Sequence, residues 1–277
     1  MLGITQLQLA AMVIYFLQLF MRNTMQLMYA KNWFNIQFQD CLPISSKQLA
    51  DGKFYELFYI EFFKRYQRYD DLDAKWRDSK RNLANYIINI IGSRNLSLLS
   101  IGCGIGYVEK HIHDTIGSQL LFDIHEIAAP ALRWIKNEID HKNIYVGEID
   151  VLEDKCYDLI YLSAVDSAIN DQDLIDLMRK LSDKLNDGGQ LIIFSAAFSN
   201  ELSQMQRIIL QLKESIKFFL EHLNLYHRGQ FWGWIRNREE YWKLLIKAGF
   251  KKPNISDGFV PNGQEYWIAG QKVTKSY

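Results

Sequence analysis

The sequence predicts an α/β fold: a doubly wound, mostly parallel seven-stranded sheet with helices on both faces. From about residue 97, short apolar runs alternate with helical patterns, which is typical of strands joined by crossover helices. A glycine-rich turn, residues 102–106, directly follows the first of these runs. With 277 residues, 48% of them apolar, the chain can also bury a sizeable core. We therefore expect residues 93–277 to form this domain.

The seven predicted strands are short apolar runs bounded by turn residues. They cover residues 98–101, 120–122, 143–146, 157–162, 190–194, 252–260 and 265–270. Helical patterns follow over residues 108–116, 127–139, 171–185 and 238–248. The last two strands flank the turn at residues 261–263, so we expect an antiparallel hairpin at the edge of the sheet. A helical insertion over residues 201–234 precedes the last helix.

Residues 1–92 are predicted to form a separate N-terminal helical region. Phe54, Phe58, Phe62, Tyr66 and Tyr69 recur every three or four residues, as on one face of an amphipathic helix. Core packing is one interpretation of this aromatic face. The alternative is an aromatic wall over an acceptor pocket.

The first 21 residues contain no charged side chain. A secretory signal would begin with a basic segment, and a membrane-spanning helix needs about 20 predominantly apolar residues. This stretch reaches that length only by counting Thr5, Gln6, Gln8 and Gln18. We predict a buried helix that packs on the main domain or on a second subunit. Membrane contact through residues 1–30 and a homodimer remain alternatives.

Charge and cysteine content exclude several classes of protein. Lys plus Arg equals Asp plus Glu, at 32 each, whereas proteins that neutralise nucleic-acid phosphates usually carry a basic excess. Only three cysteines occur, and none forms a CxxC pair. This argues against a disulfide framework and a structural zinc site, and favours a cytoplasmic setting.

The glycine-rich turn indicates a ligand site. Gly102, Gly104 and Gly106 allow the backbone to turn tightly and approach a ligand closely, and the following helix directs free N–H groups there. The dinucleotide fingerprint GxGxxG would need a glycine at position 107, which is tyrosine. No Lys-Ser/Thr pair follows to suggest a P-loop. Phosphate ligands are therefore disfavoured.

Two carboxylates extend the predicted site toward a nucleoside. Asp123 lies seventeen residues after Gly106, at the expected end of the second strand, where a carboxylate can accept hydrogen bonds from two ribose hydroxyls. A helix cap or a solvated turn is the structural alternative for Asp123. Asp150 and Val151 follow the third strand and could contact an adenine ring, although Asp150 equally suits a surface loop.

In these features the chain resembles the class I S-adenosylmethionine-dependent methyltransferases. The matching stretches are residues 99–106, 121–124, 148–151, 157–161 and 186–193. The resemblance covers roughly residues 97–200 and extends more loosely over residues 238–270. It implies S-adenosylmethionine as cofactor, with these binding positions: Ser100, Gly102, Cys103, Gly104, Gly106, Asp123, Ile124, Asp150, Val151 and Ser163. Among them, the glycines would line the methionine portion, and Ser163 would lie near the sulfonium.

The chain departs from the family pattern in two places. The family usually has Asp or Glu at the position of Ser100, so the amino group of the methionine portion needs another partner. Members that use a metal carry acidic ligands after the fourth strand, where this chain has residues 163–166, Ser-Ala-Val-Asp. No metal site is predicted. The Asn/Asp-Pro-Pro-Tyr motif of methylases that act on base amino groups is also absent.

The resemblance implies methyl transfer to a small molecule, and we expect the acceptor to be a hydroxyl of a sugar or secondary metabolite. Such an acceptor benefits from a general base. The candidates are Asp166, after the fourth strand, and His227, before the last helix, although a helix cap and a plain loop residue are the respective alternatives. A membrane-associated lipid or quinone methylase, an aminobutyl or aminopropyl transferase, and a non-catalytic cofactor-binding scaffold remain open.

Overall fold

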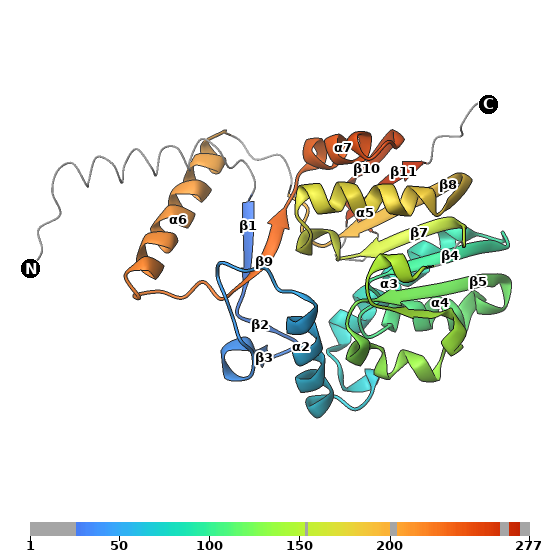
Figure 1. Cartoon of the computed structure of the whole chain (residues 1–277), viewed down its shortest axis with the longest axis horizontal. Helices are drawn as coiled ribbons and strands as arrows, with labels where there is room; N and C mark the ends of the chain where they lie inside the picture. Colours follow the sequence, from blue (N-terminus) through green and yellow to red (C-terminus); the bar gives the residue numbers. More distant parts are fainter. Residues whose placement is uncertain (1–25, 153–154, 200–203, 261–265, 272–277) are drawn as a thin grey trace, which may run out of the picture.

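The structure is a computed structural model, and it confirms the predicted seven-stranded sheet (Figure 1). It describes residues 26–152, 155–199, 204–260 and 266–271. The predicted helix within residues 1–21 lies outside the described residues. In spatial order the strands are β10 (Lys251–Phe259), β11 (Tyr266–Gln271), β8 (Leu185–Ser195), β7 (Tyr157–Ser163), β4 (Leu96–Ile101), β5 (Leu120–Glu126) and β6 (Ile144–Val146).

The five strands from β8 to β6 are parallel, and β10 and β11 add an antiparallel hairpin at one edge. One face of the sheet is covered by α5 (Asp171–Asp183) and α7 (Arg238–Lys247), and the other by α3 (Ala74–Ile91) and α4 (Tyr107–Ile116). Each face buries its own apolar cluster. The carboxyl ends of β4, β5 and β7 therefore share one edge, where ligands bind in open α/β sheets.

The N-terminal region differs in part from the helical expectation. Its described part contains α2 (Gly52–Arg65) and α3, but it begins with β1 (Gln26–Ala30), β2 (Asn32–Trp33) and β3 (Ile36–Gln37). The strand β1 pairs antiparallel with β9 (Gln230–Ile235), which lies in the predicted insertion. This pairing supplies the backbone hydrogen bonds that make β1 a strand.

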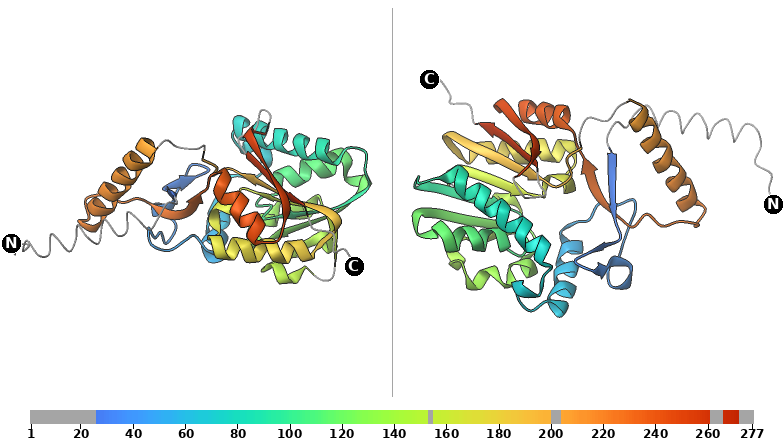
Figure 2. Two further views of the ribbon diagram at one scale, coloured as in Figure 1. Left: turned by 90° about the horizontal axis from the view of Figure 1, so that it is seen from above. Right: turned by 180° about the vertical axis from the view of Figure 1, so that it is seen from behind.

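The helix α6 (Gln204–His222) stands apart from the seven-stranded sheet, and the β1–β9 ribbon lies between them (Figures 1 and 2). It exposes several large apolar side chains to solvent, namely Met205, Ile208, Ile209, Leu212, Ile216, Phe218 and Phe219. Within the part of the chain that the structure describes, no helix has the length and apolar content needed to cross a membrane.

Candidate functional site

The glycine-rich turn joins β4 to α4 and adopts a backbone that favours glycine at three positions. Gly102, Gly104 and Gly106 have φ values of 69°, 56° and 75°, in the left-handed region. The N–H groups of Gly102 and Cys103 donate to the carbonyl oxygen of His125 at 2.8 and 3.2 Å. The turn is thereby fixed against the carboxyl end of β5.

Side chains from three other segments pack closely on this turn. A Cβ atom added at Gly102 would lie 2.3 Å from the side chain of Val165, and one at Gly106 would lie 2.6 Å from Ile135. At Gly104 the neighbour is the hydroxyl of Tyr59 on α2, at 3.0 Å. The glycines therefore permit a close approach of other groups to the backbone at each position.

The carboxylate beside the turn belongs to Glu126, the last residue of β5. One of its oxygens accepts a hydrogen bond from the N–H of Gly104 at 2.7 Å, and the other accepts from Ala128 at 3.0 Å. Burial raises the pKa of Glu126, and these backbone hydrogen bonds lower it only in part. Glu126 is not among the site residues predicted from the sequence.

Asp123 does not occupy the strand end predicted for it. β5 continues three residues further, to Glu126, and Asp123 pairs in register with Leu99 inside the sheet. Its carboxylate accepts hydrogen bonds from the hydroxyl of Tyr157 at 2.8 Å and from Lys155 at 2.9 Å. The residue at the strand end is therefore Glu126 and not Asp123, and Ile124 is a core residue of the sheet.

Asp150 and Val151 are both exposed, in a short 3-10 turn over Ile149–Val151. The carboxylate of Asp150 forms an ion pair with Lys180 on α5 at 2.9 Å. This contact directs Asp150 to the α5 side of the sheet, which suits the surface-loop alternative. The neighbouring His125 joins β5 to the chain after β6, since its Nε2 lies 2.8 Å from the carbonyl oxygen of Gly147.

Ser163 ends β7 at the same edge of the sheet as the glycine turn. It is half-buried and pairs in register with Phe194 on β8. The next residue, Ala164, takes a left-handed φ of 58°, and Val165 then packs on Gly102. The β7 end and the turn are therefore neighbours, as expected for two parts of one site.

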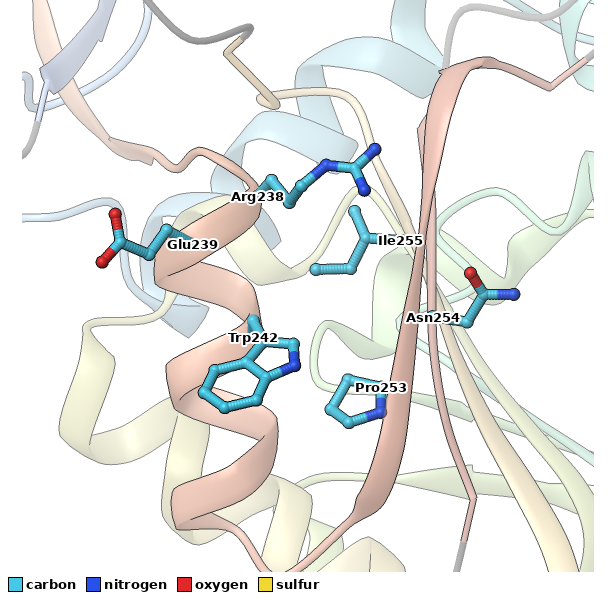
Figure 3. A pocket seen from close by; sticks show the side chains of 6 residues that line it. All are labelled: Arg238, Glu239, Trp242, Pro253, Asn254 and Ile255. Atoms are coloured by element: carbon cyan, nitrogen blue, oxygen red, sulfur yellow. The ribbon is translucent and has the colours of Figure 1, made fainter.

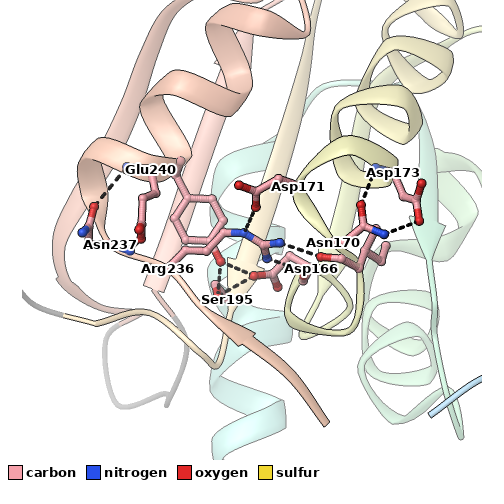
Figure 4. A network of polar contacts seen from close by, with 10 residues as sticks. Asp166, Asn170, Asp171, Asp173, Ser195, Arg236, Asn237 and Glu240 are labelled. Carbon is pink, nitrogen blue, oxygen red and sulfur yellow. Dashed lines mark hydrogen bonds and ion pairs between the residues drawn. The ribbon is translucent and has the colours of Figure 1, made fainter. Parts of the chain in front are cut away.

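Asp166 lies in a closed polar network rather than at an open crevice (Figure 4). One of its oxygens accepts hydrogen bonds from Ser195, at 2.7 Å, and from the hydroxyl of Tyr241. The side chain is fully buried, and this burial raises the pKa of Asp166 against the effect of the hydrogen bonds. The network joins the β7–α5 connection to β8 and α7, while the other oxygen, Asp166 Oδ1, is buried and has no partner among the described residues.

Arg236 completes this network from the end of β9 (Figure 4). Its guanidinium donates to the carboxylate of Asp171 at 2.9 Å and to the carbonyl oxygens of Asp166 and Ile169 at 2.8 and 2.6 Å. The other predicted base, His227, is exposed and accepts a hydrogen bond from the N–H of Gly229 through Nδ1.

An aromatic cluster from the N-terminal region covers the carboxyl edge of the sheet. Phe54, Phe58 and Phe62 are buried in it, which supports core packing for the helical aromatic face. The same cluster contains Ile105 of the glycine turn, and the hydroxyl of Tyr69 donates to the Ile105 carbonyl oxygen at 2.7 Å. The aromatic face is therefore part of a buried core that packs against the glycine turn.

The described residues contain a recess of about 430 Å³ between α7 and β10 (Figure 3). It is lined by Arg238, Glu239, Trp242, Pro253, Asn254 and Ile255. Three strands separate β10 from β4, and none of the predicted site residues lines this recess. Among the described residues, no group of three His, Cys, Asp or Glu side chains is arranged to hold a metal ion.

Comparison with protein families gives one match, to a model described as a methyltransferase domain, over residues 66–250. No curated protein matches the chain significantly. Among solved structures, mitomycin 7-O-methyltransferase is 15% identical with a TM-score of 0.53, covering 80% of this chain and 58% of its own length.

Human N-acetylserotonin methyltransferase, solved with S-adenosylmethionine, is 14% identical with a TM-score of 0.52. The match covers 88% of this chain and 63% of that structure. DesVI of Streptomyces venezuelae is 12% identical with a TM-score of 0.51, and the match covers 70% of this chain and 93% of that structure. The chain thus spans less than two thirds of the length of the mitomycin and N-acetylserotonin methyltransferases. Two further matching structures are covered over 57% and 58% of their length. These likenesses concern the fold.

Proposed function

The chain belongs to the methyltransferase family defined by this domain, and from that premise we propose that it methylates a hydroxyl of a small molecule with S-adenosylmethionine. The observation that carries the proposal is the left-handed glycine turn with the Glu126 carboxylate bonded to it. A glycine turn opening a helix can bring backbone close to a ligand, and a carboxylate at the next strand end can hold ribose hydroxyls.

The residues present suit this cofactor at three places. Gly102, Gly104 and Gly106 would face the methionine portion, Glu126 would accept from the ribose, and Ser163 would lie near the sulfonium. When bound, S-adenosylmethionine supplies a methyl group that is already activated by the positive sulfur. The protein then has to align the acceptor and exclude water, and alignment alone can account for about 7–11 kcal/mol of a barrier.

The cover over the turn would position the acceptor. Tyr59 reaches Gly104 from α2, and Trp232 of β9 stacks on Phe38 with ring centroids 5.4 Å apart. Trp232 is half-buried, and the exposed part of its ring would suit a flat or sugar-like acceptor. Two structural neighbours carry names that denote small-molecule acceptors, mitomycin and N-acetylserotonin, which supports the same acceptor class here. The proposal assigns no general base, because Asp166 is enclosed.

Calorimetric titration of the full chain with S-adenosylmethionine and S-adenosylhomocysteine tests the cofactor. A radiolabelled methyl donor, offered with a panel of phenols, sugars and hydroxylated metabolites, then tests transfer. The mass of the product separates methyl transfer from aminobutyl or aminopropyl transfer. Failure to bind either compound would contradict the proposal, and binding without turnover across the panel would favour the scaffold alternative.

A further inference from the structure

Glu109 is a buried carboxylate beside the glycine turn, and one of its oxygens has no partner. It lies in the first turn of α4 and is only 1% exposed. Its Oε1 atom accepts hydrogen bonds from Ser100 Oγ at 2.7 Å and from the hydroxyl of Tyr161 at 2.8 Å. Among the described residues, nothing forms a hydrogen bond with Oε2, which is enclosed.

The groups around Glu109 come from every side of the proposed cofactor site. Ser100 lies on β4 two residues before Gly102, and Tyr161 lies on β7 two residues before Ser163. Cys103, inside the turn, is close enough that the charge of Glu109 adds to burial in raising the pKa of its thiol. The carboxylate is therefore held between β4 and β7, close to Cys103 of the turn.

A buried carboxylate in this setting is costly without a positive partner. Burial raises the pKa of Glu109. The hydrogen bonds from Ser100, from the backbone N–H of Glu109 itself and from Tyr161, together with the weaker effect of Lys80, offset this only in part. A buried acceptor oxygen that lacks a partner costs free energy, and a cation is the partner that compensates a carboxylate best. A few other buried side-chain atoms in the described residues also lack a partner, Asp166 Oδ1 among them, but Glu109 Oε2 is the one on the helix that the glycine turn opens, and it calls for an explanation.

The proposed cofactor carries such a cation, the ammonium group of its methionine portion. Ser100 offers a hydroxyl, which carries no charge and already donates to Glu109. We propose that Glu109 provides the negative charge that binds this ammonium group, with Ser100 and Tyr161 as the residues that position its carboxylate. This inference rests on the proposed function. It assigns the negative charge to Glu109 on α4 instead of to the β4 position of Ser100, where the family usually has Asp or Glu.

The test compares two ligands by calorimetry: S-adenosylhomocysteine and its analogue in which hydrogen replaces the amino group. We expect the wild type to bind S-adenosylhomocysteine about 10- to 100-fold more tightly than the analogue, as for a hydrogen bond between charged groups. In Glu109→Gln this preference should disappear, while affinity for the analogue stays within about threefold of the wild type. Glu148→Gln, at an exposed residue, is the matched control and should keep the full preference.

The double variant Ser100→Asp with Glu109→Leu moves the carboxylate back to the strand. It should restore the preference for the amino-bearing ligand, and far-UV circular dichroism checks that each variant is folded. A preference that survives in Glu109→Gln, or an equal loss of affinity for both ligands, would overturn the inference and leave the cofactor assignment standing. Failure of the wild type to bind S-adenosylhomocysteine would overturn both.

Discussion

The carboxylate of Glu126 and the backbone N–H of Gly104 are joined by a hydrogen bond of 2.7 Å that links the end of β5 to the glycine turn. The donor and acceptor come from segments 22 residues apart. This bond fixes the turn and places a negative charge at its side. The proposed ribose contact therefore depends on Glu126 and not on Asp123.

We expect Glu126→Gln to weaken binding of S-adenosylhomocysteine by about 10- to 100-fold, because a charge-assisted hydrogen bond is worth roughly 1.5–3 kcal/mol. Asp123→Asn is the control from the same strand. Asp123 lies inside the sheet opposite Leu99, three residues before the strand end, so that variant should change affinity by less than about threefold. Calorimetry measures both, and the opposite ranking would return the ribose contact to Asp123.

Gly104→Ala should weaken cofactor binding more than it weakens folding. The left-handed φ of 56° costs an alanine about 1 kcal/mol, and the new Cβ would lie 3.0 Å from the Tyr59 hydroxyl. Gly188→Ala is the control. Gly188 has a similar φ of 77°, but an added Cβ would have no atom within 4 Å, so this variant carries only the cost of the left-handed backbone.

Thermal unfolding and calorimetry separate the two effects of Gly104→Ala. Adding Tyr59→Phe to Gly104→Ala removes the hydroxyl and should recover part of the affinity. If Gly104→Ala binds S-adenosylhomocysteine like the wild type, then the backbone at this position does not face the ligand.

The glycine turn was predictable because its signal is local, whereas the carboxylate beside it was not. Glycines at positions 102, 104 and 106 favour a left-handed backbone whatever other segments pack against the turn. The end of β5, in contrast, is set by its neighbours, since His125 and Glu126 pair with Tyr145 and Val146 on β6. The available signal was that apolar and polar residues keep alternating after Asp123, at Ile124 and His125, which indicates that the strand runs further.

Long-range partners also explain the other differences between sequence and structure. β1 is a strand because β9, some 200 residues later in the sequence, supplies its hydrogen bonds. Asp166 is enclosed because Tyr241 and Arg236, 75 and 70 residues away, converge on it. No local pattern around Asp166 contains this information, so the strand end alone suggested an accessible base.

Arg236 should be among the most sensitive positions for stability. Its side chain is fully buried and donates to one carboxylate and two carbonyl oxygens, which Arg236→Met would leave without their donor. Asp171 is 45% exposed and can be hydrated, so the loss comes chiefly from the two carbonyl oxygens, each costing about 1–3 kcal/mol when left without a donor in the interior. Chemical denaturation measures the loss. Arg68→Met, at an exposed ion pair, should change the free energy of unfolding by less than about 1 kcal/mol, and equal effects would show that the network contributes little.

Asp166→Asn should alter how stability depends on pH. Burial raises the pKa of Asp166 above its ordinary value of 3.8, so the folded state holds this proton more tightly than the unfolded state. The stability of the wild type therefore falls as pH rises from about 4 through the folded pKa. Asparagine can still accept from Ser195 and Tyr241 but does not ionise, so the variant should gain stability relative to the wild type over that range.

Asp158→Asn supplies a control of the opposite sign. Partial burial would raise the pKa of Asp158, but the hydrogen bonds from Ser97 and Asn186 lower it on balance. The wild type therefore gains stability from this carboxylate as pH rises through 3.8, and the asparagine variant should lose stability relative to it. Denaturant titrations between about pH 2 and pH 8 measure both differences, because the Asp158 effect develops below pH 3.8 and the Asp166 effect above it. Parallel curves for Asp166→Asn and the wild type would mean that Asp166 ionises in the fold as readily as in the unfolded chain, which would reopen its assignment as a base.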